Sequence, residues 1–323
     1  MKNNLFVIFL FLLLPLALFT GCRGETADVN KHQILADHLR TSGLDLPTMH
    51  TTGWVVPATT LHANLAAYYI IDIRLPVDFA AGRIQGAVNS TMANVVTTAR
   101  NAQTAGQLTG REIIVVCYTG QTAAFAVAAL RLSGFPTARN LMWGMSSWNS
   151  TLDRWTPRIA NLTHANIVTP PNFAANVEFT NRPIVTSESN DPVVILRERV
   201  QAVLNEGLRG VTAAEVLANP GNFFINNYWS AQAVTENGNR HIAGAFRILP
   251  LTLANNEIRF LDPSRAIVNY CFTGQTSAAV AFYLRVLGYD VYSFMFGANS
   301  MWNTAMTANR WPITPTNNFP LVQ

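Results

Sequence analysis

Short apolar runs alternate with longer stretches of helical periodicity, and this alternation occurs twice along the chain. Continuous apolar runs such as 68–73 and 112–116 are typical of strands buried on both faces. Strands are predicted at 68–73, 112–116 and 137–142 in the first half, and at 222–226, 265–270 and 290–294 in the second. Helices are predicted at 76–81, 92–105, 146–152, 275–287 and 299–306, with a further helix that ends at Leu132. This alternation predicts an α/β fold whose mainly parallel sheets are flanked by helices.

The second half of the chain repeats the first. Cys271 lies 154 residues after Cys117. The same offset separates Arg131 from Arg285, Gly134 from Gly288 and Trp148 from Trp302. A repeat of this length predicts two domains in tandem. We expect the first domain over 51–160 and the second over 194–315, joined by a linker over 161–193.

The N-terminus has the features of an export signal. Lys2 precedes an apolar run over 5–20 that is too short for a comfortable membrane span, and Cys22 follows it. The pattern resembles a bacterial lipoprotein signal over 1–22, with Cys22 as the lipidated residue and 23–50 as a tether. It predicts a lipoprotein anchored to the membrane on the periplasmic side of the cell envelope, with an uncleaved anchor as the alternative.

The charge of the chain is nearly balanced, with 22 Lys and Arg against 18 Asp and Glu and a net charge of +4. Because no block of like charge occurs, we expect neither nucleic-acid binding nor a polybasic membrane patch. The six histidines show no paired spacing with cysteines or carboxylates, so no metal site is predicted. No glycine-rich phosphate loop precedes a helix, and no cofactor is predicted.

The most informative motif is a six-residue loop that occurs twice, each time between an apolar strand and a predicted helix. Its copies are Cys117, Tyr118, Thr119, Gly120, Gln121 and Thr122, and Cys271, Phe272, Thr273, Gly274, Gln275 and Thr276. A cysteine at the start of a helix meets backbone N–H groups and the positive end of the helix dipole, which favour the thiolate. We expect these two cysteines to be free, each in a site of its own, rather than joined in a disulfide.

Further motifs accompany the first loop, at 71–74, at 79–87 and at 143–144. In this order and spacing they resemble the tandem rhodanese-like sulfurtransferases. The resemblance implies that Cys117 accepts a sulfane sulfur as a persulfide and passes it to a nucleophile, with Cys271 as a second catalytic cysteine. We expect Asp72 and Arg74 to support the site, although an ion pair between these two residues is an equally good interpretation of Arg74.

The chain also departs from related patterns. Phosphatases and arsenate reductases of similar fold use a longer loop that ends in arginine, and Ala123 and Ser277 stand at that position here, so phosphatase chemistry is not expected. Among the possible donors, thiosulfate, polysulfide or another persulfide, the neutral residues that flank both cysteines disfavour thiosulfate. The acceptor would be an unknown thiol or protein. The alternative function is a non-catalytic binding or sulfur-carrier module of the cell envelope.

The two halves are expected to be unequal. Asn226 and Tyr228 replace Asp72 and Arg74 in the second half, so a charge pair there is lost. We therefore expect Cys117 to be the principal site and Cys271 a second one. His241 is expected to pack and form hydrogen bonds rather than act as a base, because persulfide chemistry does not require one.

Overall fold

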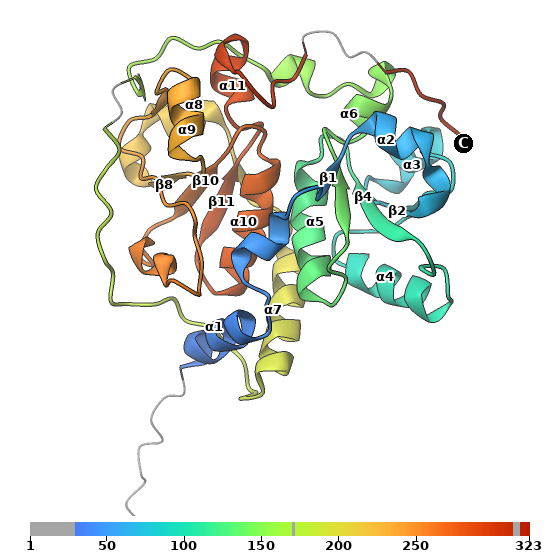
Figure 1. Cartoon of the computed structure of the whole chain (residues 1–323), viewed down its shortest axis with the longest axis horizontal. Helices are drawn as coiled ribbons and strands as arrows, with labels where there is room; N and C mark the ends of the chain where they lie inside the picture. Colours follow the sequence, from blue (N-terminus) through green and yellow to red (C-terminus); the bar gives the residue numbers. More distant parts are fainter. Residues whose placement is uncertain (1–29, 170–171, 313–316) are drawn as a thin grey trace, which may run out of the picture.

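The computed structural model describes residues 30–169, 172–312 and 317–323, and it contains two parallel sheets flanked by helices (Figure 1). The first sheet has the order β1 (Val55–Val56), β5 (Arg139–Leu141), β4 (Glu112–Val116), β2 (Tyr68–Asp72) and β3 (Val88–Asn89). The second has the order β7 (Gly210–Val211), β11 (Val291–Phe294), β10 (Ile267–Tyr270) and β8 (Phe224–Asn227). The predicted α/β class is confirmed. The second sheet has the same strand order as the first but, within the described residues, lacks a strand that corresponds to β3.

The helices of the first half are α2 (Ala58–Ala63), α3 (Pro76–Ala81), α4 (Val95–Thr104), α5 (Gln121–Leu132) and α6 (Met145–Trp148). Those of the second half are α7 (Pro192–Glu206), α8 (Ala213–Ala218), α9 (Ala231–Glu236), α10 (Gln275–Val286) and α11 (Asn299–Trp302). The helices expected at 146–152 and 299–306 are both shorter than predicted. Each ends after one turn and continues as a 3-10 turn, at Ser150–Leu152 and at Asn303–Ala305. In the first case Asn149 adopts an extended conformation that interrupts the helix.

Helices α5 and α10 pack against each other between the two sheets (Figure 1). Both are rich in alanine, and small side chains allow two helices to approach closely. At their contact the rings of Phe125 and Phe282 meet edge to face, with centroids 4.7 Å apart. One hydrophobic core therefore includes both helices and joins the two halves. This packing also places the loops that precede the two helices next to each other.

The prediction of a tether over 23–50 is wrong for its described part. Residues from Lys31 onward form helix α1 (Lys31–Thr41) and a 3-10 turn (Leu46–His50). Leu35, Leu39, Leu46 and Met49 of this segment are at most 1% exposed and belong to the core formed with α5, α7 and α10. The apolar side chains of α1 recur at helical spacing, which gives this segment a face to bury.

The C-terminus and the linker also differ from the predicted domain limits. Residues 317–323 return to the first half, where Arg83 and Val322 exchange two backbone hydrogen bonds of 3.0 Å. Within the expected linker, strand β6 (Ile167–Val168) pairs with β9 (His241–Ile242) of the second half. The expected signal at 1–22, with Cys22, lies outside the described residues. In the part of the chain that the structure describes, no helix is long and apolar enough to span a membrane.

Candidate active site

The first cysteine loop curls around the sulfur atom of Cys117. Strand β4 ends at Val116, and Gly120 adopts φ 82°, a left-handed conformation that glycine tolerates best, as the residue before helix α5. The N–H groups of Gly120 and Ala123 donate to Cys117 Sγ at 3.1 and 3.3 Å. The tight turn thus aims backbone donors at the place where a negative charge on sulfur would lie.

Burial of the Cys117 thiol and the hydrogen bonds from these donors have opposite effects on its pKa. The Cys117 side chain lies inside the fold, and desolvation raises the pKa of its thiol above the ordinary value. Hydrogen bonds from the N–H groups of Ala123, Thr119 and Gly120 lower this pKa, while the nearby Asp72 carboxylate raises it further. The net shift is upward, so the expectation that the loop favours the thiolate is wrong for Cys117 in this conformation. The loop supplies the predicted donors, but burial outweighs them.

The second loop has the same form. Cys271 is buried, Gly274 adopts φ 78° before helix α10, and the N–H of Ser277 donates to Cys271 Sγ at 3.4 Å. Both cysteines are free, as predicted. Of the remaining members of the predicted loops, four lie between the strand and the helix, namely Tyr118, Thr119, Phe272 and Thr273. The other four begin helices α5 and α10, namely Gln121, Thr122, Gln275 and Thr276.

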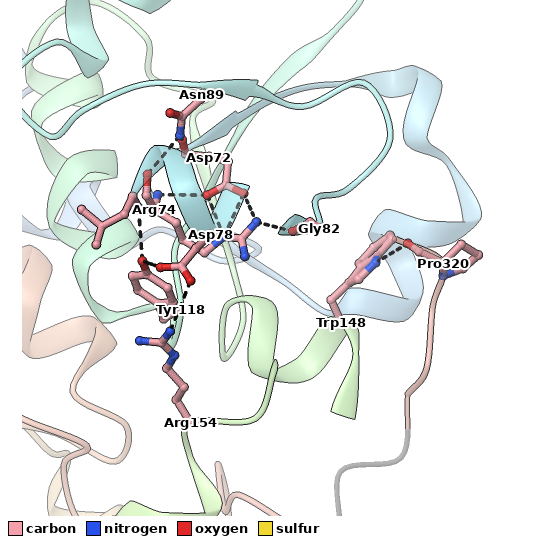
Figure 2. A network of polar contacts seen from close by, with 10 residues as sticks. Asp72, Arg74, Asp78, Gly82, Asn89, Tyr118, Trp148, Arg154 and Pro320 are labelled. Carbon is pink, nitrogen blue, oxygen red and sulfur yellow. Dashed lines mark hydrogen bonds and ion pairs between the residues drawn. The ribbon is translucent and has the colours of Figure 1, made fainter. Parts of the chain in front are cut away.

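Asp72 and Arg74 form a buried ion pair at the end of β2 (Figure 2). Arg74 Nη2 lies 2.7 Å from Asp72 Oδ2 and also donates to the carbonyl oxygen of Gly82 at 2.8 Å. Both side chains are 1% exposed, so the guanidinium is enclosed in the fold. The ion-pair interpretation of Arg74 is the one that the structure shows.

The corresponding position in the second half is neutral, as predicted. Asn226 donates to Asn269 Oδ1 at 2.9 Å and accepts from the N–H of Ile248 at 2.8 Å. The Tyr228 hydroxyl lies 3.1 Å from His50 Nε2 in the N-terminal segment. Hydrogen bonds between neutral groups thus take the place of the ion pair.

Tyr118 of the first loop belongs to a second polar network that the sequence did not reveal (Figure 2). Its hydroxyl donates to Asp78 and accepts from the N–H of Leu75. The guanidinium of Arg154 lies 3.9 Å from the centre of the Tyr118 ring, and its Nη2 is 3.8 Å from Asp78. A positive charge therefore lies over the aromatic residue that follows Cys117. Because Asp78 and Arg154 lie far from Tyr118 in the sequence, no local sequence motif indicates that these residues contact it.

The two loops touch each other through their glutamines. Gln121 Oε1 accepts from the N–H of Phe296 in the second half at 2.7 Å, and Gln275 Oε1 accepts from Asn140 Nδ2 in the first half at 2.7 Å. Both glutamines are buried. A Cβ added to Gly120 would lie 2.8 Å from Gln275 Oε1, so glycine is required there for space as well as for conformation. The two predicted sites are therefore neighbours rather than separate.

A cavity of about 240 Å³ opens beside Cys271. It is lined by Trp54, Val55, Met142, Cys271, Phe272, Thr273, Gln275, Thr276 and Asn309. The first three of these residues belong to the first half of the chain, so the cavity depends on the packing of the two halves. The cysteine expected to be secondary is thus provided with a cavity that can hold a small molecule.

Other predicted features are structural. His241 is buried, its Nδ1 lies 2.8 Å from the carbonyl oxygen of Asn239, and its ring lies against Phe173. This is the packing role expected from the sequence. Across the described residues, no group of three His, Cys, Asp or Glu side chains is arranged to hold a metal ion.

Comparison with known proteins gives matches to rhodanese-like proteins. The family described as "Rhodanese-like domain" matches residues 57–151. Thiosulfate sulfurtransferase GlpE of Pseudomonas entomophila is 31% identical over 97 residues, which cover 30% of this chain and 84% of that protein. A rhodanese-related protein from Thermoplasma volcanium is 23% identical over 29% of this chain and 88% of its own, with a TM-score of 0.24. A thiosulfate sulfurtransferase from Pseudomonas aeruginosa is 16% identical over 89% of this chain and 49% of its own, with a TM-score of 0.31.

Proposed function

This chain belongs to the rhodanese family of sulfurtransferases, and from that premise we propose that it carries sulfane sulfur as a persulfide on Cys117 and Cys271. The observation that carries the proposal is the pair of loops whose backbone N–H groups donate to the two sulfur atoms. In the first step the cysteine thiolate attacks the outer sulfur of a donor, a new S–S bond forms, and the donor leaves with the electron pair of the broken bond. In the second step a thiophilic acceptor attacks the same sulfur and releases the cysteine thiolate.

We also propose that the two halves are rhodanese-like units in tandem. Their sheets share a strand order, their cysteine loops share a sequence, and the helices that follow these loops pack together. In place of the ion pair of Asp72 and Arg74, the second half has Asn226 and Tyr228. The units therefore share the loop and differ in what surrounds it.

Mass spectrometry of the intact protein tests the persulfide directly. The protein is incubated with thiosulfate or with polysulfide, its mass is measured, and cyanide is then added as acceptor. We expect a gain of one sulfur atom for each reactive cysteine, lost again when thiocyanate forms. Cys117→Ser and Cys271→Ser rank the two sites. An unchanged mass with both donors, or full activity in the double variant, would contradict the proposal.

A non-catalytic carrier or binding module is the second candidate. The observation in its favour is that Cys117 and Cys271 are only 2% and 3% exposed, and that burial raises the pKa of the Cys117 thiol. Turnover separates the two functions. A carrier gains sulfur once and holds it in the presence of cyanide, whereas an enzyme forms thiocyanate in excess over its own cysteines.

The cellular location is a separate proposal. A lysine followed by an apolar run and Cys22 supports export and lipidation at that cysteine, which would place the protein on the periplasmic side of the cell envelope. Metabolic labelling with a fatty acid tests this, with Cys22→Ala as control. Recovery of unlabelled protein in the soluble fraction would contradict the anchor.

A further inference from the structure

We infer that the cavity beside Cys271 selects sulfur donors with an apolar substituent and at most one negative charge, and that it discriminates against the thiosulfate dianion. This inference rests on the proposed function, since it names the substrate class of one of its two sites. It follows from the composition of the cavity wall, from the rigidity of that wall and from the charge that the wall lacks.

The wall contributed by the first half is apolar. Trp54, Val55 and Met142 line the cavity together with the cysteine loop. Phe272 belongs to that loop and is stacked on Trp229, with ring centroids 4.2 Å apart. Two aromatic residues and two aliphatic chains therefore surround the space next to Cys271. Covering an apolar substituent with such a surface is favourable because apolar area is removed from water.

The polar part of the wall carries no charge. Thr273, Gln275, Thr276 and Asn309 contribute hydroxyl and amide groups. Among the residues that the structure describes, no Lys, Arg, His, Asp or Glu lines this cavity. A dianion that enters would lose hydration without gaining a cation, whereas the backbone N–H groups of the loop suit the single charge of a thiolate or persulfide.

The cavity is also held in its present shape. Gln275 is buried, and its Oε1 is occupied by the hydrogen bond from Asn140, two residues before the cavity residue Met142. This contact ties the loop of the second half to the wall that the first half supplies. The loop glutamine is therefore not free to turn and replace the missing cation by a donor group.

The first loop provides an internal contrast. There the guanidinium of Arg154 lies over Tyr118, the residue that corresponds to Phe272. A cation over the residue that follows Cys117 and a neutral cavity beside Cys271 predict different donor preferences for the two sites. Cys117 should accept the anionic donor more readily than Cys271 does.

The chemistry balances for the donor class that we infer. The Cys271 thiolate attacks the terminal sulfur of an organic thiosulfonate, R–SO₂–S⁻, and a Cys–S–S⁻ persulfide forms. The S–S bond of the donor breaks, and its electron pair leaves with the sulfinate, R–SO₂⁻. Two negative charges stand on each side of the reaction, and no external oxidant or reductant is needed.

Binding and transfer are tested separately. In the Cys117→Ser, Cys271→Ser double variant, which cannot form a persulfide, titration calorimetry compares benzenethiosulfonate, methanethiosulfonate and thiosulfate. We expect the affinity to fall in that order, by about tenfold or more between the first and the last. Because the first site can also bind thiosulfate, the titration is repeated with Asn309→Lys added, and only the binding that this change alters is assigned to the cavity. Equal or tighter binding of thiosulfate at the cavity would overturn the inference, whatever the outcome of the transfer assay.

Transfer is then measured in Cys117→Ser, with cyanide as acceptor. Val55→Lys and Asn309→Lys each place a cation at the cavity, and we expect either to raise kcat/KM for thiosulfate relative to benzenethiosulfonate by about tenfold. Val193→Lys adds the same charge at an exposed position of helix α7 and should leave this ratio unchanged. An unchanged ratio in both cavity variants would overturn the inference. No sulfur gain at Cys271 with any donor would instead overturn the proposed function of that cysteine.

Discussion

At the scale of single residues, the ion pair of Asp72 and Arg74 shows how a charge is kept inside the fold. Both side chains are 1% exposed. The Arg74 guanidinium donates hydrogen bonds to both carboxylate oxygens of Asp72 and to the carbonyl oxygen of Gly82. Removal of one partner of such a pair leaves an uncompensated buried charge. The second half of the chain places neutral residues at the same positions and folds in the same way.

Arg74→Leu should therefore lower the free energy of unfolding by about 3–5 kcal/mol, because the Asp72 carboxylate loses its partner. The double variant Asp72→Asn, Arg74→Tyr reproduces Asn226 and Tyr228 and should cost clearly less than Arg74→Leu. Urea denaturation measures both. If the double variant has a lower free energy of unfolding than Arg74→Leu, the unpaired Asp72 charge is not what destabilises Arg74→Leu, and the prediction is contradicted.

The Cys117 thiol should be alkylated with an unusual pH dependence. Burial raises its pKa, so its thiolate should form above the ordinary range of about 8.5 for a free cysteine. In Cys271→Ser, the rate of reaction with iodoacetamide should keep rising beyond that pH. Raised pKa values also imply that stability is lost as pH rises through the folded-state pKa. A reactivity midpoint below 8 would contradict the balance described for this loop.

At the scale of elements, helices α5 and α10 and the loops before them behave as one unit. Each loop ends in a glutamine whose side chain crosses to the other half, Gln121 to the backbone of Phe296 and Gln275 to Asn140. Phe296 immediately precedes Gly297, at which an added Cβ would collide with the carbonyl oxygen of Cys271. A change at Gln121 should therefore alter the backbone packing next to Cys271.

Gln121→Ala should leave the partly buried N–H of Phe296 without its acceptor and lower the free energy of unfolding by about 1 kcal/mol. It should also change the alkylation rate of Cys271, although Gln121 lies in the loop of Cys117. Thr122→Ala, one residue further along the same helix, is the matched control and should do neither. An unaltered Cys271 rate in Gln121→Ala would show that the contact only holds the two halves together.

At the scale of the whole molecule, the two ends of the described chain are part of the fold. The N-terminal segment is held against the second half by contacts of His32 Nδ1 with the Leu287 carbonyl, at 2.8 Å, and of His50 Nε2 with the Tyr228 hydroxyl, at 3.1 Å. Burial lowers the pKa of both histidines below the ordinary value of 6.5. The segment therefore docks with His32 and His50 neutral.

Stability should fall as pH decreases below about 6.5, because the unfolded chain then binds protons that the folded chain excludes. The free energy of unfolding should fall by up to about 1.4 kcal/mol per pH unit for each histidine, until the pH reaches its folded-state pKa. Urea midpoints between pH 7.5 and 5 measure this slope. His32→Leu should reduce it, whereas His164→Gln, at an exposed position, should not. An unchanged slope in His32→Leu would contradict the role of burial.

The sequence by itself determined the local features of this protein. The apolar run that follows Glu112 and the proline at the start of Pro76–Ala81 specify a strand and a helix through neighbouring residues, and both elements, Glu112–Val116 and Pro76–Ala81, have the predicted limits. The repeated loop likewise revealed the two cysteines, because glycine and a following helix fix the direction of nearby N–H groups. These signals span only a few residues, so periodicity and turn chemistry are sufficient to identify them.

Only the tertiary structure decided what surrounds the loops. The contact between the loops and the cavity beside Cys271 join residues of the two halves, and they exist because α5 packs on α10. The Tyr118 network with Arg154 also joins residues that are distant along the chain, within the first half. The same burial reversed the expected shift of the Cys117 pKa. Sequence spacing does not encode such desolvation, because it depends on how much of the whole chain lies over the thiol.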